Sequence, residues 1–142
     1  MSFDTLGDLN WLAVMVAALA YFVLGGIWYA PPVFGNAWMR AAGFEQPTEG
    51  EGPGASIYIA PLIGDIVAAI AVGMLAAASG SDTLSEGLVL GLVTGIGIAA
   101  VIIGTTAVFE SKKPSAMTWF WITAAYHLVG FVLMGTIVAA WQ

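Results

Sequence analysis

Four long apolar runs dominate the pattern of hydrophobic and polar positions along this chain. They cover about residues 9–29, 56–78, 84–109 and 116–141. Each run reaches or exceeds the roughly 20 residues that an α-helix needs to cross about 30 Å of hydrocarbon. Such runs must be helices or strands of a closed barrel, and they lack the alternation of barrel strands. The pattern therefore predicts an all-α polytopic membrane protein, with four transmembrane helices in one compact bundle that forms a single domain.

Polar residues beside the runs predict where two of the helices begin. Thr5 followed by Asp8 has the spacing of a capping box, in which side chains satisfy free N–H groups at a helix start. Thr83 followed by Glu86 has the same spacing. These pairs predict helix starts ahead of the first and third apolar runs.

The segment after the first run carries two different patterns. Apolar residues recur near helical spacing over about residues 33–44, which predicts a short helix lying in the membrane interface. Residues 46–54 are rich in glycine and acidic side chains, which is typical of a flexible linker.

Composition strengthens the membrane assignment and limits the partners. Of the residues, 60% are hydrophobic and 8% are charged, and the net charge is −6. Nucleic-acid binding needs clusters of Lys and Arg, so we expect the lipid bilayer, and no nucleic acid, as a partner. The acidic balance also suits a high-salt prokaryotic cytoplasm. The chain has no cysteine, which excludes disulfides and thiolate metal sites.

Three basic residues predict the orientation in the membrane. Arg40 lies in the first loop, and Lys112 and Lys113 lie in the third. The positive-inside rule places these loops in the cytoplasm and both termini outside a plasma membrane. The first run lacks a basic leader and is longer than the apolar core of a signal peptide, so we expect it to stay as a mature helix.

Asp65 and His127 are the two ionisable side chains set deep inside the apolar runs. At 1.5 Å per residue they lie about 13 Å and about 16 Å from the charged-loop ends of their helices. Both share a helix face with small or polar residues, which favours the bundle interior over lipid. We expect both to point inward and to pair directly or through water. Glu110, Thr123 and Tyr126 are candidates to assist them.

Three alternatives remain open for this intramembrane polar site, because charge in a membrane is costly and usually has a use. It can be a structural pair that orders the bundle, a proton- or ion-handling site, or a metal site with Glu110 as a third ligand. A His-x-x-x-His pattern and a carboxylate cluster are both missing from the sequence, so we expect no metal and no cofactor.

Small residues predict close helix contacts. Gly87, Gly91 and Gly95 recur at four-residue spacing on the third run and make a flat groove for another helix. That helix can belong to the same chain or to a partner, and a homo-oligomer or a membrane partner protein is expected. Residues 21–25 also resemble residues 126–130, on helices of opposite direction, as in an inverted repeat.

The most distinctive motif follows the first run and is made of Trp28, Tyr29, Pro31, Phe34, Gly35 and Trp38. This motif resembles one found in a family of small prokaryotic four-helix membrane proteins. The resemblance extends to Asn10-Trp11, to Glu110 with Pro114, and to Tyr126-His127 followed by Gly135 and Trp141. That family is catalogued as domain of unknown function 1761. The resemblance implies a fold and a membrane location, since the family has no established activity. Asp65 matches no position of that pattern, so its importance rests on physics alone.

These features favour proton- or ion-linked transport, or a channel-like function, through the Asp65 and His127 site. The alternative is a structural or accessory subunit that packs on itself or on a partner. An enzyme is not expected, because the sequence has no nucleophile elbow, His-rich metal motif or phosphate-binding loop.

Overall fold

The computed structural model describes residues 2–45, 54, 56–110 and 112–141. The predicted linker over residues 46–54 lies outside this part of the chain, apart from Gly54. Over the described residues the elements are all helical: η1 (Phe3–Gly7), α1 (Trp11–Trp28), η2 (Pro31–Gly35), α2 (Asn36–Ala42), α3 (Ser56–Ser79), α4 (Leu84–Thr94), η3 (Gly95–Ala100), α5 (Val101–Phe109) and α6 (Ala116–Ala140).

Four of the described helical stretches are long and apolar enough to cross a membrane: Trp11–Trp28, Ser56–Ser79, Leu84–Phe109 and Ala116–Ala140. The third span has the predicted bounds, and the bounds of the other three differ from the prediction by two residues at most. The interfacial segment predicted after the first span is also helical, as η2 followed directly by α2.

One of the two predicted capping boxes forms. Thr83 and Glu86 cap α4 reciprocally, with the Thr83 side chain accepting the Glu86 N–H. The prediction for Thr5 is wrong, since Thr5 lies inside the 3-10 helix η1. Asn10 caps α1 instead, because it stands directly before the apolar run and its side-chain oxygen accepts the N–H of Ala13 at 3.2 Å.

The third span differs from a regular α-helix in its middle. A π-helical segment, η3, joins α4 to α5. This segment begins with Gly95, Ile96 and Gly97, which alternate in size. A π-helical turn carries an extra residue and therefore rotates the side chains that follow it relative to those before it. Hydrophobic periodicity alone contains no signal for this insertion.

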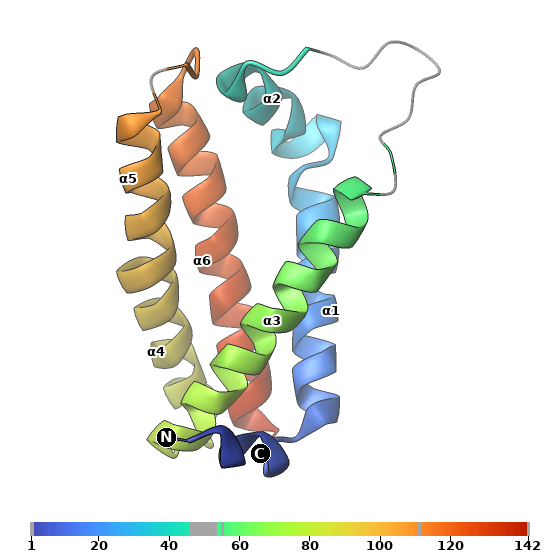
Figure 1. Ribbon diagram of the computed structural model, residues 1–142, viewed down its shortest axis with the longest axis vertical. Coiled ribbons are helices and arrows are strands. Elements are labelled where there is room, and N and C mark those ends of the chain that lie inside the picture. Colours follow the sequence, from blue (N-terminus) through green and yellow to red (C-terminus); the bar gives the residue numbers. More distant parts are fainter. Residues whose placement is uncertain (1, 46–53, 55, 111, 142) are drawn as a thin grey trace.

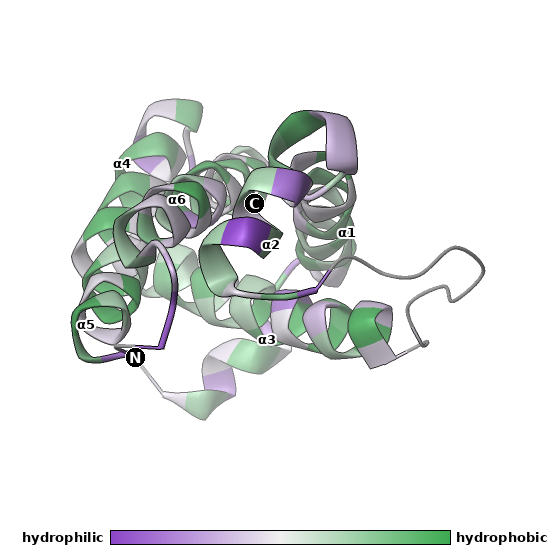
Figure 2. Cartoon of the chain, turned by 90° about the horizontal axis from the view of Figure 1, so that it is seen from above, coloured by the Kyte–Doolittle hydropathy of each residue, from purple (hydrophilic) through white to green (hydrophobic). Residues whose placement is uncertain are grey.

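Helix α6 occupies the centre of the bundle and packs against α1, α2, α3, α4 and α5. Figure 1 shows α1 on one side of it, the α4–η3–α5 span on the other, and α3 running obliquely across α1 and α6. Figure 2 shows hydrophobic residues along all the long helices, and many large apolar side chains on these helices are exposed, as expected for spans that face lipid.

Gly87, Gly91 and Gly95 of the third span face α6. A Cβ added at Gly87 would overlap the backbone of Gly135, and one at Gly91 would overlap that of Val132. A Cβ at Gly95 would lie 3.0 Å from the Leu128 side chain. Of the two partners that the sequence left open, an internal helix occupies the glycine groove.

Candidate functional site

Tyr21 and His127 connect α1 to α6 inside the bundle. The Tyr21 hydroxyl and Nδ1 of His127 form a hydrogen bond. Tyr21 is 2% exposed, and His127 is partly buried. A neutral imidazole can donate or accept at Nδ1 according to its tautomer. The bond therefore satisfies two polar groups that hydrocarbon would leave unpaired, and it holds the ring of His127 in one orientation.

Two glycines make room for tyrosines on the facing helix. A Cβ at Gly130 of α6 would overlap the Tyr21 ring, and a Cβ at Gly25 of α1 would lie 2.9 Å from the Tyr126 hydroxyl oxygen. The two tyrosine rings lie 5.0 Å apart. On each helix the tyrosine precedes the glycine by four residues, and the helices run in opposite directions (Figure 1). The packing is therefore reciprocal, and it accounts for the likeness between residues 21–25 and 126–130.

Asp65 approaches this tyrosine pair from α3. Its side chain is buried, with 7% of the residue exposed, and it acts electrostatically on both Tyr21 and Tyr126. Its Oδ2 atom has no hydrogen-bond partner among the described residues. Buried polar atoms almost always have partners, so an orphaned carboxylate oxygen inside an apolar bundle needs an explanation.

The expected pairing of Asp65 with His127, directly or through water, stays a prediction, since the hydrogen bond described for His127 goes to a different residue. Both residues lie toward the bundle as expected, but Nδ1 of His127 bonds to Tyr21. Tyr21 comes from a third helix, α1. Matching depth on two helices does not reveal which residue of a third helix bonds to one of them.

Asp65 also marks the point where α3 enters the bundle. Residues 56–64 are exposed apart from Leu62, which is partly buried, and Asp65 is the first buried residue of the helix. After it, buried positions recur to the end of α3. The carboxyl group therefore lies at the boundary between the free and the packed part of α3, rather than in the middle of its packed face.

The aromatic motif of the first loop covers the tyrosine pair at the charged-loop end. The indole N–H of Trp28 donates to the Ile122 carbonyl at 3.2 Å, and that of Trp38 donates to the Thr123 hydroxyl at 3.1 Å. The ring of Tyr29 contacts both Tyr126 and Trp38, with centroid distances of 5.1 Å and 5.3 Å. Thr123 therefore anchors the motif to α6, and Tyr126 belongs to both the motif and the site.

The remaining motif residues shape this cover. The ring of Phe34 lies 4.7 Å from that of Trp28. Pro31 starts η2 after Ala30 in extended conformation, as a residue before proline prefers. Gly35 is buried, and a Cβ there would overlap the Tyr29 carbonyl oxygen. The motif is thus a packed unit in which each bulky or small residue has a defined neighbour.

Glu110 takes no part in the site. It caps α5 and forms an ion pair with Lys113 at the bundle end, where its side chain is half exposed. Among the described residues no three His, Cys, Asp or Glu side chains gather closely enough to hold a metal ion. The metal alternative with Glu110 as third ligand therefore has no geometric support.

The site as a whole is a small polar cluster in an apolar bundle, formed by Asp65, Tyr21, Tyr126 and His127 from three helices. Tyr21 is the member that sequence reasoning missed. The only signal for it was the likeness of residues 21–25 to residues 126–130, which pairs Tyr21 with Tyr126. Chemically, the cluster can hold a proton on a carboxyl group, two phenols and an imidazole.

The fold and the site define an integral membrane protein with four membrane-crossing helices and a polar cluster between three of them. The family model described as "Protein of unknown function (DUF1761)" matches residues 12–139, and the chain belongs to this family. No curated protein and no solved structure matches the chain.

Proposed function

We propose that this protein handles protons at Asp65, as a small proton-linked transporter or channel-like protein. The observation that carries the proposal is the buried Oδ2 atom of Asp65, which has no hydrogen-bond partner among the described residues. Burying an ionisable residue within a membrane span costs free energy, and such residues commonly mark ion or proton pathways.

The orphaned oxygen argues against a purely structural pair. A carboxyl group that only orders helices is expected to have its hydrogen bonds satisfied, since an unpaired buried polar atom costs about 1–3 kcal/mol. In this bundle His127 has Tyr21 as its partner, whereas Asp65 keeps an unpaired oxygen. The imidazole of His127 thus has a hydrogen-bond partner other than Asp65. The Oδ2 atom of Asp65 stays available for an exchangeable ligand such as a proton.

A proton fits the described surroundings of Asp65 better than a metal ion. A metal needs several ligands around it, and the described residues hold no group of three suitable side chains. A proton needs only one oxygen, and it removes the charge that the apolar bundle disfavours. Tyr21 and Tyr126 lie within electrostatic reach of the carboxyl group, although neither hydroxyl is hydrogen-bonded to Oδ2.

The accessory-subunit alternative loses its main support from sequence. That support was the glycine groove of the third span, and α6 of the same chain fills the groove. The groove is therefore not available to a partner protein, and we keep proton handling as the proposal.

The test is proton flux in vesicles. The purified chain is reconstituted into liposomes that enclose a pH-sensitive dye, and a potassium diffusion potential drives proton entry. We expect flux above that of protein-free vesicles, a loss of at least tenfold in Asp65→Asn, and a smaller loss in His127→Phe, because His127 bonds to a neighbour of the carboxyl group rather than to the carboxyl group itself.

The matched control is Asp82→Asn, the same chemical change in the exposed loop before α4. It should keep the flux of the unchanged chain. Equal flux in Asp65→Asn and the unchanged chain, with both eluting as folded protein in size-exclusion chromatography, would sink the proposal.

A further inference from the structure

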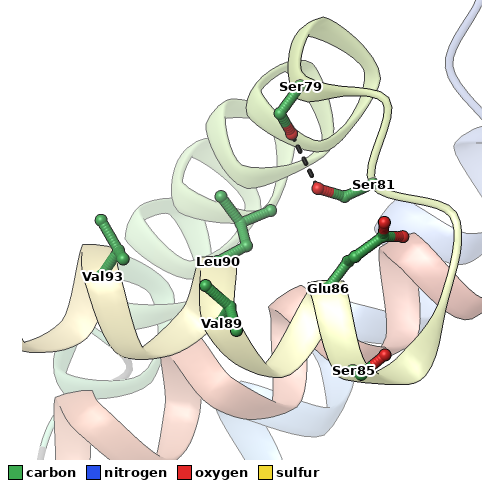
Figure 3. Close-up of a pocket in the computed structure, with 7 residues that line it drawn as sticks. All are labelled: Ser79, Ser81, Ser85, Glu86, Val89, Leu90 and Val93. Atoms are coloured by element: carbon green, nitrogen blue, oxygen red, sulfur yellow. Dashed lines mark hydrogen bonds between the residues drawn. The ribbon is translucent and has the colours of Figure 1, made fainter.

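A separate hollow lies at the opposite end of the bundle from the basic loops, between the end of α3, the α3–α4 connection and α4. Its volume is about 440 Å³, which is within the range of small-molecule sites. Figure 3 shows the side chains that line it. None of them belongs to the Asp65 cluster, so the hollow is independent of the proposed proton site.

The hollow is polar at one end and apolar at the other. Glu86 and Ser81 lie at the polar end, and Val93 lies at the far end with Val89 and Leu90 between (Figure 3). Glu86 and Val93 are seven residues apart on the same span, which is about 10 Å along a helix. This length accommodates a charged head at one end and an apolar chain at the other.

The carboxylate of Glu86 is held in place at the polar end. Its Oε2 atom accepts the Thr83 hydroxyl at 2.7 Å, and the N–H groups of Asp82 and Thr83 at 3.0 and 3.1 Å. The hydroxyls of Ser79 and Ser81 bond to each other at 2.8 Å beside it. Three bonds to Oε2 fix the negative charge without an ion partner, since none of its donors is a cation.

Charge at this end of the molecule is of one sign. Asp82 lies in the α3–α4 connection and Glu86 in the first turn of α4, and the chain start adds Asp4 and Asp8, all of them exposed. The three basic residues of the chain, Arg40, Lys112 and Lys113, lie in α2 and in the α5–α6 loop, at the other end (Figure 1). A positive ligand therefore meets complementary charge here and no Lys or Arg side chain of the chain.

We infer that this hollow binds a single-chain amphiphilic cation, with its ammonium head at Glu86 and its apolar chain along Val89, Leu90 and Val93. An anionic amphiphile would face repulsion from Glu86 and Asp82. A neutral one would gain the apolar contacts without the charge complementarity.

The experiment measures binding of tritium-labelled dodecyltrimethylammonium to the full chain in dodecyl maltoside micelles, by scintillation proximity. We expect saturable binding that unlabelled dodecyltrimethylammonium displaces and that dodecanol, which has the same chain and no charge, does not. Glu86→Gln should weaken binding about fivefold, the upper range for an exposed ion pair. Glutamine can still complete the capping box, so the start of α4 is preserved.

Two matched controls separate the site from general effects. Asp8→Asn removes the same charge from the same end of the molecule, and it should leave binding unchanged. Val93→Trp fills the apolar end of the hollow and should reduce binding at least tenfold, whereas Val101→Trp, at a similarly exposed valine outside the hollow, should not.

Several results would overturn the inference. These are the absence of saturable binding, equal displacement by dodecanol, an unchanged affinity in Glu86→Gln, or the same weakening in Asp8→Asn as in Glu86→Gln. The last result would indicate attraction to the acidic end as a whole rather than binding in the hollow.

Discussion

The position of the Tyr21 ring depends on Gly130 of the facing helix α6, which has no side chain. The ring occupies the space above Gly130, where any Cβ would overlap it, and the Tyr21 hydroxyl reaches His127 one turn away. Tyr126 uses Gly25 in the same way, but there only the hydroxyl at the end of the side chain is close, at 2.9 Å. The two contacts have the same geometry, but the end of the Tyr126 side chain can move away from Gly25 more easily than the Tyr21 ring can move away from Gly130.

This difference gives the first prediction. Gly130→Ala should lower the free energy of unfolding by about 1–3 kcal/mol, because the ring of Tyr21 must move against packed neighbours. Gly25→Ala should cost clearly less, because the end of the Tyr126 side chain can shift. Thermal unfolding in detergent, followed by tryptophan fluorescence, measures both.

Gly26→Ala is the control, since a Cβ there would have no atom within 4 Å. It should be neutral or slightly stabilising, as alanine is the better helix former. The reciprocal packing would be refuted if Gly130→Ala were as stable as Gly26→Ala.

At the scale of elements, the approach of α4 to α6 is set by backbone rather than side chains. The atoms that a Cβ at Gly91 would overlap are the Cα and N of Val132 and the carbonyl oxygen of Phe131. Main-chain atoms cannot rotate away as a side chain does, so the two helices would have to separate. In lipid this loses dispersion contacts, which are the main source of helix affinity there.

We therefore predict that Gly91→Ala lowers the melting temperature of the protein in detergent more than any lipid-facing substitution in the same span. Gly97→Ala is the matched comparison, because Gly97 lies six residues further along the span with no atom near its Cβ position. A melting temperature for Gly91→Ala equal to that for Gly97→Ala would contradict the close α4–α6 contact.

The helix bounds were predictable because each span is marked by its own local signals. Apolar length predicted all four spans, and Thr83 with Glu86 marked the start of α4. The π-helical segment Gly95–Ala100 was not predictable, since one extra residue in a turn changes the rotation of a helix without changing its hydropathy.

The site was predictable in part for the same reason. Depth along a helix follows from residue count, and facing follows from the small or polar residues on the same helix face, so the inward placement of Asp65 and His127 could be predicted. Their partners depend on how the helices rotate about their axes, and this is decided by contacts such as Tyr21 on Gly130. Tyr21 and Gly130 lie far apart in the sequence, and their contact forms only because α1 and α6 pack side by side.

For the whole molecule, the two ends of the bundle differ in both contacts and charge. At one end the Ser115 N–H donates to the Ala41 carbonyl at 3.2 Å, which joins the start of α6 to α2. At the other end the Asn10 side chain donates to the Trp141 carbonyl at 2.6 Å, which joins the two chain termini. Figure 1 shows the termini together at one end and α2 with the α5–α6 loop at the other.

This arrangement gives the last prediction, on orientation. All three basic residues lie at the α2 end, so the positive-inside rule places that end in the cytoplasm and both termini outside. The chain has no cysteine, so single substitutions report position without background. In intact cells a membrane-impermeant maleimide should label Ser2→Cys, and it should label Glu45→Cys and Ser115→Cys only after the membrane is permeabilised. All three positions are exposed, so access through the membrane alone decides the result. Labelling of Glu45→Cys and Ser115→Cys in intact cells, with Ser2→Cys protected, would reverse the orientation and would place the Glu86 hollow on the cytoplasmic side.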